Sequence, residues 1–176
     1  MSDLSKLEEV LDQSKGRPIR NYLINGLTSY LMDDMRVRYF QNTRVQQQFI
    51  TPHSHRYDLA CLVIRGEVVN TLWKSSDSQD EVADKFELAE QEYTGEPGKY
   101  TLSRNEDSIG YWTHQSRQYG EGEIYHMKSD EIHSIHFSNR AKVLFFEGRS
   151  QTQFSKVLLP VVDGETITMP QFAMND

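Results

Sequence analysis

The stretch that decides the fold is residues 51–68, TPHSHRYDLACLVIRGEV. Two histidines, His53 and His55, are separated by one residue and followed by an apolar run that ends at Gly66. Side chains two positions apart on a strand point to the same face, so both imidazoles can reach one point. Pro52 has no amide donor, which is typical of the start of a strand. The stretch predicts a metal site at the head of a strand, with a polar loop of two solvated histidines as the alternative.

A change of pattern at about residue 36 indicates many short strands. The segments that follow are rich in β-branched and aromatic residues, among them VRYF, LACLVIRG, EVVNTLWK, SIGYWTHQSRQY, HSIHFS and AKVLFFEG. Turn residues separate them, as in EPGK, YGEGE and KSDE. Many short strands at this spacing predict an antiparallel sandwich or barrel. The long helical crossovers that a parallel sheet needs are absent from the sequence.

The first part of the chain shows the spacing of helices. Leu4, Leu7 and Leu11 recur at helical intervals in SDLSKLEEVLDQS, and a second apolar stripe follows the break at KGRP. Members of that second stripe are Ile19, Tyr22, Leu23, Leu27, Tyr30 and Leu31. We therefore expect two N-terminal α-helices in residues 1–35, packed on a β-barrel formed by residues 36–176, with one domain overall.

The composition excludes several classes of partner. The 176 residues include 26 acidic and 19 basic ones, for a formal net charge of −7, which argues against nucleic acid or an anionic membrane surface. No apolar run approaches the roughly 18–20 residues that cross a bilayer, and the charged N-terminus has no apolar signal core. The single cysteine, Cys61, excludes an intrachain disulfide. We expect a cytoplasmic protein with a reduced thiol in its interior.

A third ligand is predicted by the later stretch GEIYHMKSDEIHSIHFSN, in which KSDE is a turn and His133 opens a new strand. The chain resembles the cupin pattern of His-x-His, Glu, Gly and a later Pro-x-Gly-x-x-His. The first half of the pattern matches His53-Ser54-His55 and Gly66, and the second half matches residues 128–133 (KSDEIH) in spacing. The resemblance covers about residues 51–140. It implies a single cupin-type antiparallel β-barrel, or jelly roll, with a metal in its mouth held by His53, His55 and His133.

The chain departs from the cupin pattern at one ligand. The glutamate of the pattern falls on Leu59, or on Ala60 with the longer spacer, and Asp58 should point to the opposite face from Leu59. The three remaining histidines are similar to the sites of cysteine dioxygenases and diketone dioxygenases. Cys61 lies six residues after His55 rather than five, and VLFFEG has no counterpart of the late tyrosine of cysteine dioxygenase, so we interpret Cys61 as a core residue.

Three neutral imidazoles leave a divalent ion with its full charge, which favours an anionic or chelating ligand and leaves positions open for substrate and dioxygen. We therefore expect a non-haem iron dioxygenase that acts on a small anionic or chelating molecule, with iron(II) as the first choice of metal. Zinc, nickel and manganese are alternatives. Two other functions stay open: a metal-dependent cupin hydrolase, isomerase or lyase that uses no dioxygen, and a non-catalytic cupin that binds metal or ligand.

Other polar residues are candidates for supporting roles. His114, in YWTHQSRQY, and His126, before the KSDE turn, are candidates for catalytic proton transfer. Arg44 and Arg117 are candidates for binding an anionic substrate because their strands should flank the mouth. His136 is three residues past His133, so on a regular strand it should face the other way. The expected partner is a small molecule, and pairing of cupins through sheet edges leaves a homodimer open.

Overall fold

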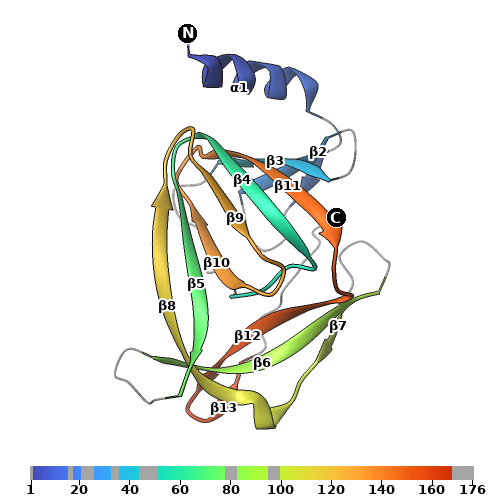
Figure 1. Cartoon of the computed structure of the whole chain (residues 1–176), viewed down its shortest axis with the longest axis vertical. Coiled ribbons are helices and arrows are strands. Elements are labelled where there is room, and N and C mark those ends of the chain that lie inside the picture. The colour runs from blue at the N-terminus through green and yellow to red at the C-terminus, as the bar shows by residue number, and fades with distance from the viewer. Residues whose placement is uncertain are drawn as a thin grey trace.

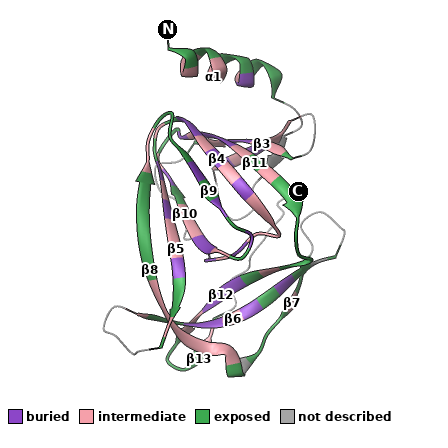
Figure 2. Cartoon of the chain, viewed as in Figure 1, coloured by how far each residue is buried: buried purple, intermediate pink, exposed green. Residues whose placement is uncertain are grey.

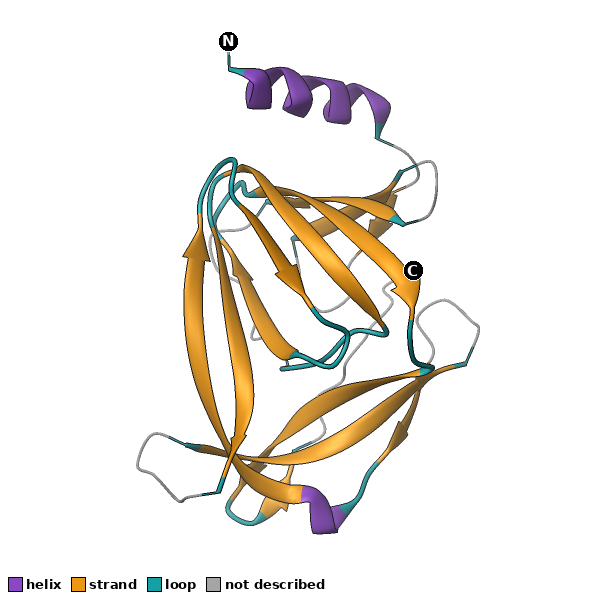
Figure 3. Ribbon diagram, in the orientation of Figure 1, coloured by secondary structure: helices purple, strands orange, loops and turns teal. Residues whose placement is uncertain are grey.

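The computed structural model describes residues 2–15, 18–20, 26–32, 36–43, 51–77, 83–94 and 100–167. In chain order the elements are α1 (Asp3–Ser14), β1 (Pro18–Arg20), β2 (Leu27–Leu31), β3 (Val37–Asn42), β4 (Tyr57–Arg65), β5 (Val68–Ser76), β6 (Asp84–Tyr93), β7 (Tyr100–Ser103), a 3₁₀ turn η1 (Glu106–Ser108), β8 (Ile109–Tyr119), β9 (Ile124–Met127), β10 (Ile132–Phe137), β11 (Lys142–Ser150), β12 (Phe154–Val162) and β13 (Glu165–Thr166). The prediction of a mainly β protein is confirmed (Figure 3).

The strands form two curled antiparallel sheets (Figure 1). The first sheet has the order β1-β2-β3-β11-β4-β9. The second has the order β10-β5-β8-β6-β12-β13, with β7 added alongside β6. Strands far apart in sequence are therefore neighbours, as β11 lies between β3 and β4, and β12 lies beside β6.

The prediction of a second N-terminal helix is wrong. Residues 27–31 form strand β2, which pairs with β3 on one side and β1 on the other. Leu27 and Ser29 are buried in the alternating pattern of a strand. Gly26 precedes them with φ 108°, a value that only glycine adopts readily and that no helix continues through. Pairing with β3 thus outweighs a helical propensity that is weak by itself.

The main core lies between the two sheets. Figure 2 shows buried residues on the facing strands of both sheets. The buried members of the main core are Leu27, Phe40, Leu59, Cys61, Val63, Val68, Tyr125, Met127, Phe137, Ala141 and Val143. A second cluster, around Trp73, Phe86 and Leu158, joins strands β5, β6 and β12 of the second sheet. Among the described residues, no helix is long and apolar enough to cross a membrane.

Helix α1 packs on the outer face of the first sheet. Its buried Leu11 belongs to a cluster with Tyr39, Ile64 and Leu144, whose neighbours along β3, β4 and β11 face the main core. Ser2 caps the helix by accepting the amide hydrogen of Ser5 at 3.2 Å. The prediction of a helix at this position is confirmed.

An ion-pair cluster fastens α1 to strand β11. The Lys142 ammonium donates to Glu8 Oε1 at 2.6 Å and to Asp12 Oδ2 at 2.8 Å. The hydrogen bond from Lys142 lowers the pKa of Glu8. Burial alone would raise the pKa of Asp12, but the hydrogen bond and charge of Lys142 outweigh it and lower that pKa. Both carboxylates are therefore held in their charged form.

We expect Lys142→Met to lower the melting temperature at pH 7 by about 2–4 °C, since it removes two partly exposed ion pairs. Carboxylates with lowered pKa stabilise the fold above their unfolded pKa, and this contribution is lost as pH falls through their folded pKa. The gap between wild type and Lys142→Met should thus shrink below about pH 4, in the range of the ordinary carboxylate pKa values. Thermal melts at pH 7 and pH 3 measure it, and a gap that is equal at both would contradict it.

Candidate metal centre

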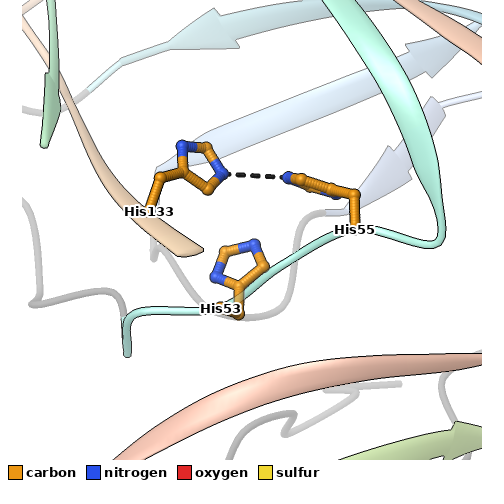
Figure 4. A group of neighbouring side chains, drawn as sticks. All are labelled: His53, His55 and His133. Carbon is orange, nitrogen blue, oxygen red and sulfur yellow. Dashed lines mark hydrogen bonds between the residues drawn. The ribbon is translucent and has the colours of Figure 1, made fainter. Parts of the chain in front are cut away.

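Three histidines from two distant parts of the chain face one another (Figure 4). His53 and His55 precede β4, and His133 lies on β10. The ligand atoms that they offer all lie within 4.8 Å of one another. Their ring centroids are 5.0, 5.1 and 5.0 Å apart, so the three imidazoles surround a common point almost symmetrically.

Backbone hydrogen bonds hold residues 52–54 between two strands. The amide of His53 donates to the His133 carbonyl at 2.8 Å, and the His133 amide returns a bond to the His53 carbonyl at 2.9 Å. On the other side, the Ser54 amide donates to the Lys156 carbonyl and the Leu158 amide donates to the Pro52 carbonyl, both at 2.8 Å. The alternative of two solvated histidines in a loop therefore does not describe this segment.

Oxygen acceptors fix the orientation of two of the rings. Nδ1 of His133 lies 2.6 Å from Asn70 Oδ1, and Nδ1 of His53 lies 2.9 Å from the carbonyl oxygen of Thr51. Because these oxygens can only accept, each Nδ1 carries the hydrogen and each Nε2 keeps its lone pair. Such a partner on the other ring nitrogen is the usual support of a metal-binding histidine.

The spacing of two ring nitrogens fits a metal ion. Nε2 of His55 lies 2.9 Å from Nε2 of His133. Two nitrogens bound at about 2.0–2.1 Å to one ion lie about 2.9 Å apart at a right angle and about 3.4 Å apart at the tetrahedral angle. The spacing of this pair matches two neighbouring ligand positions at a right angle.

Burial keeps the three imidazoles neutral. It lowers the pKa of His53, although the hydrogen bond to Thr51 opposes the shift. The pKa values of His55 and His133 lie well below their ordinary value, first because of burial and then because a proton on one ring would repel a proton on the next. The positive charge of Arg38 further lowers the pKa of His55. Neutral imidazole is the form that binds a metal ion.

The position of the expected glutamate holds no carboxylate. Leu59 is buried in the main core. Asp58 instead accepts hydrogen bonds from the Lys128 ammonium at 3.0 Å and the Ser129 amide at 2.9 Å. Both bonds lower the pKa of Asp58, and the bond from the Lys128 ammonium has the larger effect. Asp58 thus ties the turn that leads to His133 to the start of β4, which joins the two segments that carry the histidines.

Two other candidate histidines lie apart from this cluster. His126 is exposed on β9, opposite Ala60, and therefore faces away from the buried side of β4. The His114 ring lies 4.9 Å from Trp73, and its Nδ1 is 4.0 Å from Asp84 Oδ2. The structure does not bring either ring into the group of converging ligand atoms. His136 is exposed on β10, on the opposite face from His133.

The two candidate arginines remain predictions. Arg117 is exposed on β8, where its guanidinium lies 4.9 Å from the centre of the Tyr119 ring. Its backbone is opposite Asn70, so it is on the same face of the sheet as the partner of His133. Arg44 lies outside the described residues.

Sequence reasoning missed three residues that hold the imidazoles. Asn70 was not singled out, although a buried amide in the apolar stretch EVVNTLWK is a recognisable signal. The rings of Tyr57 and Phe145 lie 5.6 and 5.9 Å from His55 and form an aromatic wall beside it. Phe145 comes from β11, and no feature of the sequence places it next to His55.

Comparisons with known proteins find distant similarities to solved structures. No family model and no curated protein matches the chain. Among solved structures, the cupin domain of Drosophila melanogaster CENP-C has 12% identity over 84% of this chain and 100% of its own, with a TM-score of 0.39. A hydroquinone 1,2-dioxygenase, PnpCD, in complex with Cd²⁺ and 4-hydroxybenzonitrile has 13% identity over 85% of this chain and 69% of its own, with a TM-score of 0.34.

Proposed function

We propose that this chain is a metal-binding protein with a cupin-type barrel, in which His53, His55 and His133 hold one divalent transition-metal ion. The observation that carries the proposal is the convergence of three neutral imidazoles with two Nε2 atoms 2.9 Å apart. The hydrogen bonds from His133 to Asn70 and from His53 to the Thr51 carbonyl support it. Such an acceptor on the other ring nitrogen is the usual partner of a metal-binding histidine.

We further propose a dioxygenase that uses iron(II) and acts on a small anionic or chelating molecule. When bound, the ion would supply open positions at which substrate and dioxygen can meet. The protein's own contribution is to keep the three rings neutral and fixed. Tyr57 and Phe145 cover one side of His55 and exclude water from that side. Catalytic proton transfer by His114 or His126 stays a prediction.

Metal content and oxygen uptake test the proposal. Protein purified without chelator should contain close to one equivalent of metal, and removal of the metal should lower the melting temperature by about 5–10 °C if the ion is present at a hundredfold excess over its Kd. Oxygen uptake by the iron form with enolic, thiol or carboxylate compounds would support the dioxygenase. Full metal without oxygen uptake favours a hydrolase, isomerase or lyase, and protein without metal affinity favours a non-catalytic cupin.

The location of the protein in the cell and its assembly are also proposed. We propose a cytoplasmic location, which agrees with the buried free thiol of Cys61, whose pKa burial raises to about 12. The proposed partner is a small molecule. Light scattering of the purified chain distinguishes the homodimer from the monomer.

A further inference from the structure

An ion pair on the inner face of the first sheet lies near the three histidines. Glu147 on β11 is directly opposite Leu59 on β4, and Arg38 on β3 is directly opposite Phe145 on β11. Directly opposite residues point to the same face of a sheet. Leu59 and Phe145 pack in the main core, so both charged side chains start from the inner face of the first sheet.

Contacts link this pair to the wall beside His55. Arg38 Nε donates to Glu147 Oε1 at 2.5 Å, and the Glu147 side chain is only 11% exposed. The Tyr57 side chain is hydrogen-bonded to the Glu147 side chain. The Tyr57 ring in turn stacks on His55 with an angle of 30° between the planes. Glu147 is therefore anchored by a cation and a hydroxyl next to the imidazoles.

A glycine lets β11 approach closely enough for this arrangement. The pairing of β11 with β4 shifts register between Glu147 and Ser150. A Cβ atom at Gly148 would lie 2.8 Å from the Asp58 carbonyl oxygen, which is closer than real Cβ contacts allow. The local bulge thus needs glycine at this position, and it ends the regular pairing directly after Glu147.

We propose that Glu147 supplies, from the neighbouring strand, the negative charge that the cupin pattern places at Leu59, and that Arg38 offsets this charge. The inference rests on the proposed metal site. Glu147 is a positioning residue in this scheme, because its carboxylate is not among the converging ligand atoms. It would act on the ion through space, and Arg38, which is paired with Glu147, would oppose it.

Opposite effects of the two charges on metal affinity test the inference. Isothermal titration with Co²⁺ at pH 7.5 would compare wild type with Glu147→Gln, Arg38→Gln and the double variant. Loss of one charge near a divalent ion in a partly buried site should change its affinity by roughly five- to tenfold. Glu147→Gln should weaken Co²⁺ binding, Arg38→Gln should strengthen it, and the double variant should return to within about twofold of wild type. Glu67→Gln, on the exposed turn between β4 and β5, is the matched control and should change nothing.

The outcome separates charge from structure. Arg38→Lys keeps the charge and should bind Co²⁺ like wild type; affinity rising in Arg38→Lys as in Arg38→Gln would overturn the inference. Weakening by both single charge-removing variants, or an effect of neither, would also overturn it. In both cases His133→Ala still loses Co²⁺, so the metal site itself stands. Retention of Co²⁺ by His133→Ala would overturn the metal site and this inference together.

Discussion

His133→Ala should bring the metal content close to zero and lower metal affinity at least about a hundredfold. The variant removes one of three ligands and the ring nitrogen that lies 2.9 Å from His55 Nε2. It also leaves the buried Asn70 oxygen without its hydrogen-bond donor, so some loss of stability is expected. Elemental analysis after purification without chelator, together with metal titration of the apo-protein, measures the effect.

The matched control is His136→Ala. His136 lies on the same strand three residues further along, but it is exposed and faces the other way. It should keep the metal content and the melting temperature of wild type. Equal metal content in His133→Ala and His136→Ala would show that the converging imidazoles are not a metal site.

Asn70→Leu should weaken metal binding by about 10–100-fold without removing a ligand. Its side chain fixes the His133 ring by accepting the Nδ1 hydrogen at 2.6 Å. Without this acceptor, the ring can carry its hydrogen on Nε2, the atom that must bind the ion, and it can rotate. Losses of 10–100-fold are typical when such a supporting partner is removed. Competition with a chelator of known affinity gives the measurement.

Asn70→Asp distinguishes orientation from packing. It has nearly the same shape, still accepts from His133 Nδ1, and adds a negative charge near the ion, so it should bind metal at least as tightly as wild type. Thr71→Ala is a control on the outer face of β5, where Thr71 contacts Ser116, and it should leave affinity unchanged. If Asn70→Asp lost as much affinity as Asn70→Leu, the proposed role of this hydrogen bond would be wrong.

Local patterns in the sequence predict the elements whose signals are local. Helix α1 has regular helical spacing and a capping residue, and the short strands after residue 36 have turn residues between them. Residues 18–31 could not be assigned this way. Their apolar residues fit a helical stripe, but residues 27–31 form a strand because they pair with β3, and residues 18–20 form a strand because they pair with β2. Pairing with a distant partner has no signature within the segment itself.

The same limit applies to the site. The spacing of His53, His55 and His133 was visible because each lies in a short motif next to a turn or strand start. The residues that support them come from pairings between remote strands, as Glu147 does when it lies opposite Leu59. A missing carboxylate can be seen in one strand of the sequence, but its replacement from another strand needs the register of the sheet.

The segment 52–54 has a consequence for how the protein folds. His55 and His133 are 78 positions apart, and Ser54 is 102 positions from its partner Lys156. Contacts between such distant residues form slowly, because long loops must close first. The imidazoles can therefore meet only after β10, which carries His133, has reached this short segment. Uptake of a metal ion during refolding would thus report when β10 reaches this segment, and the bound ion would slow the loss of that contact.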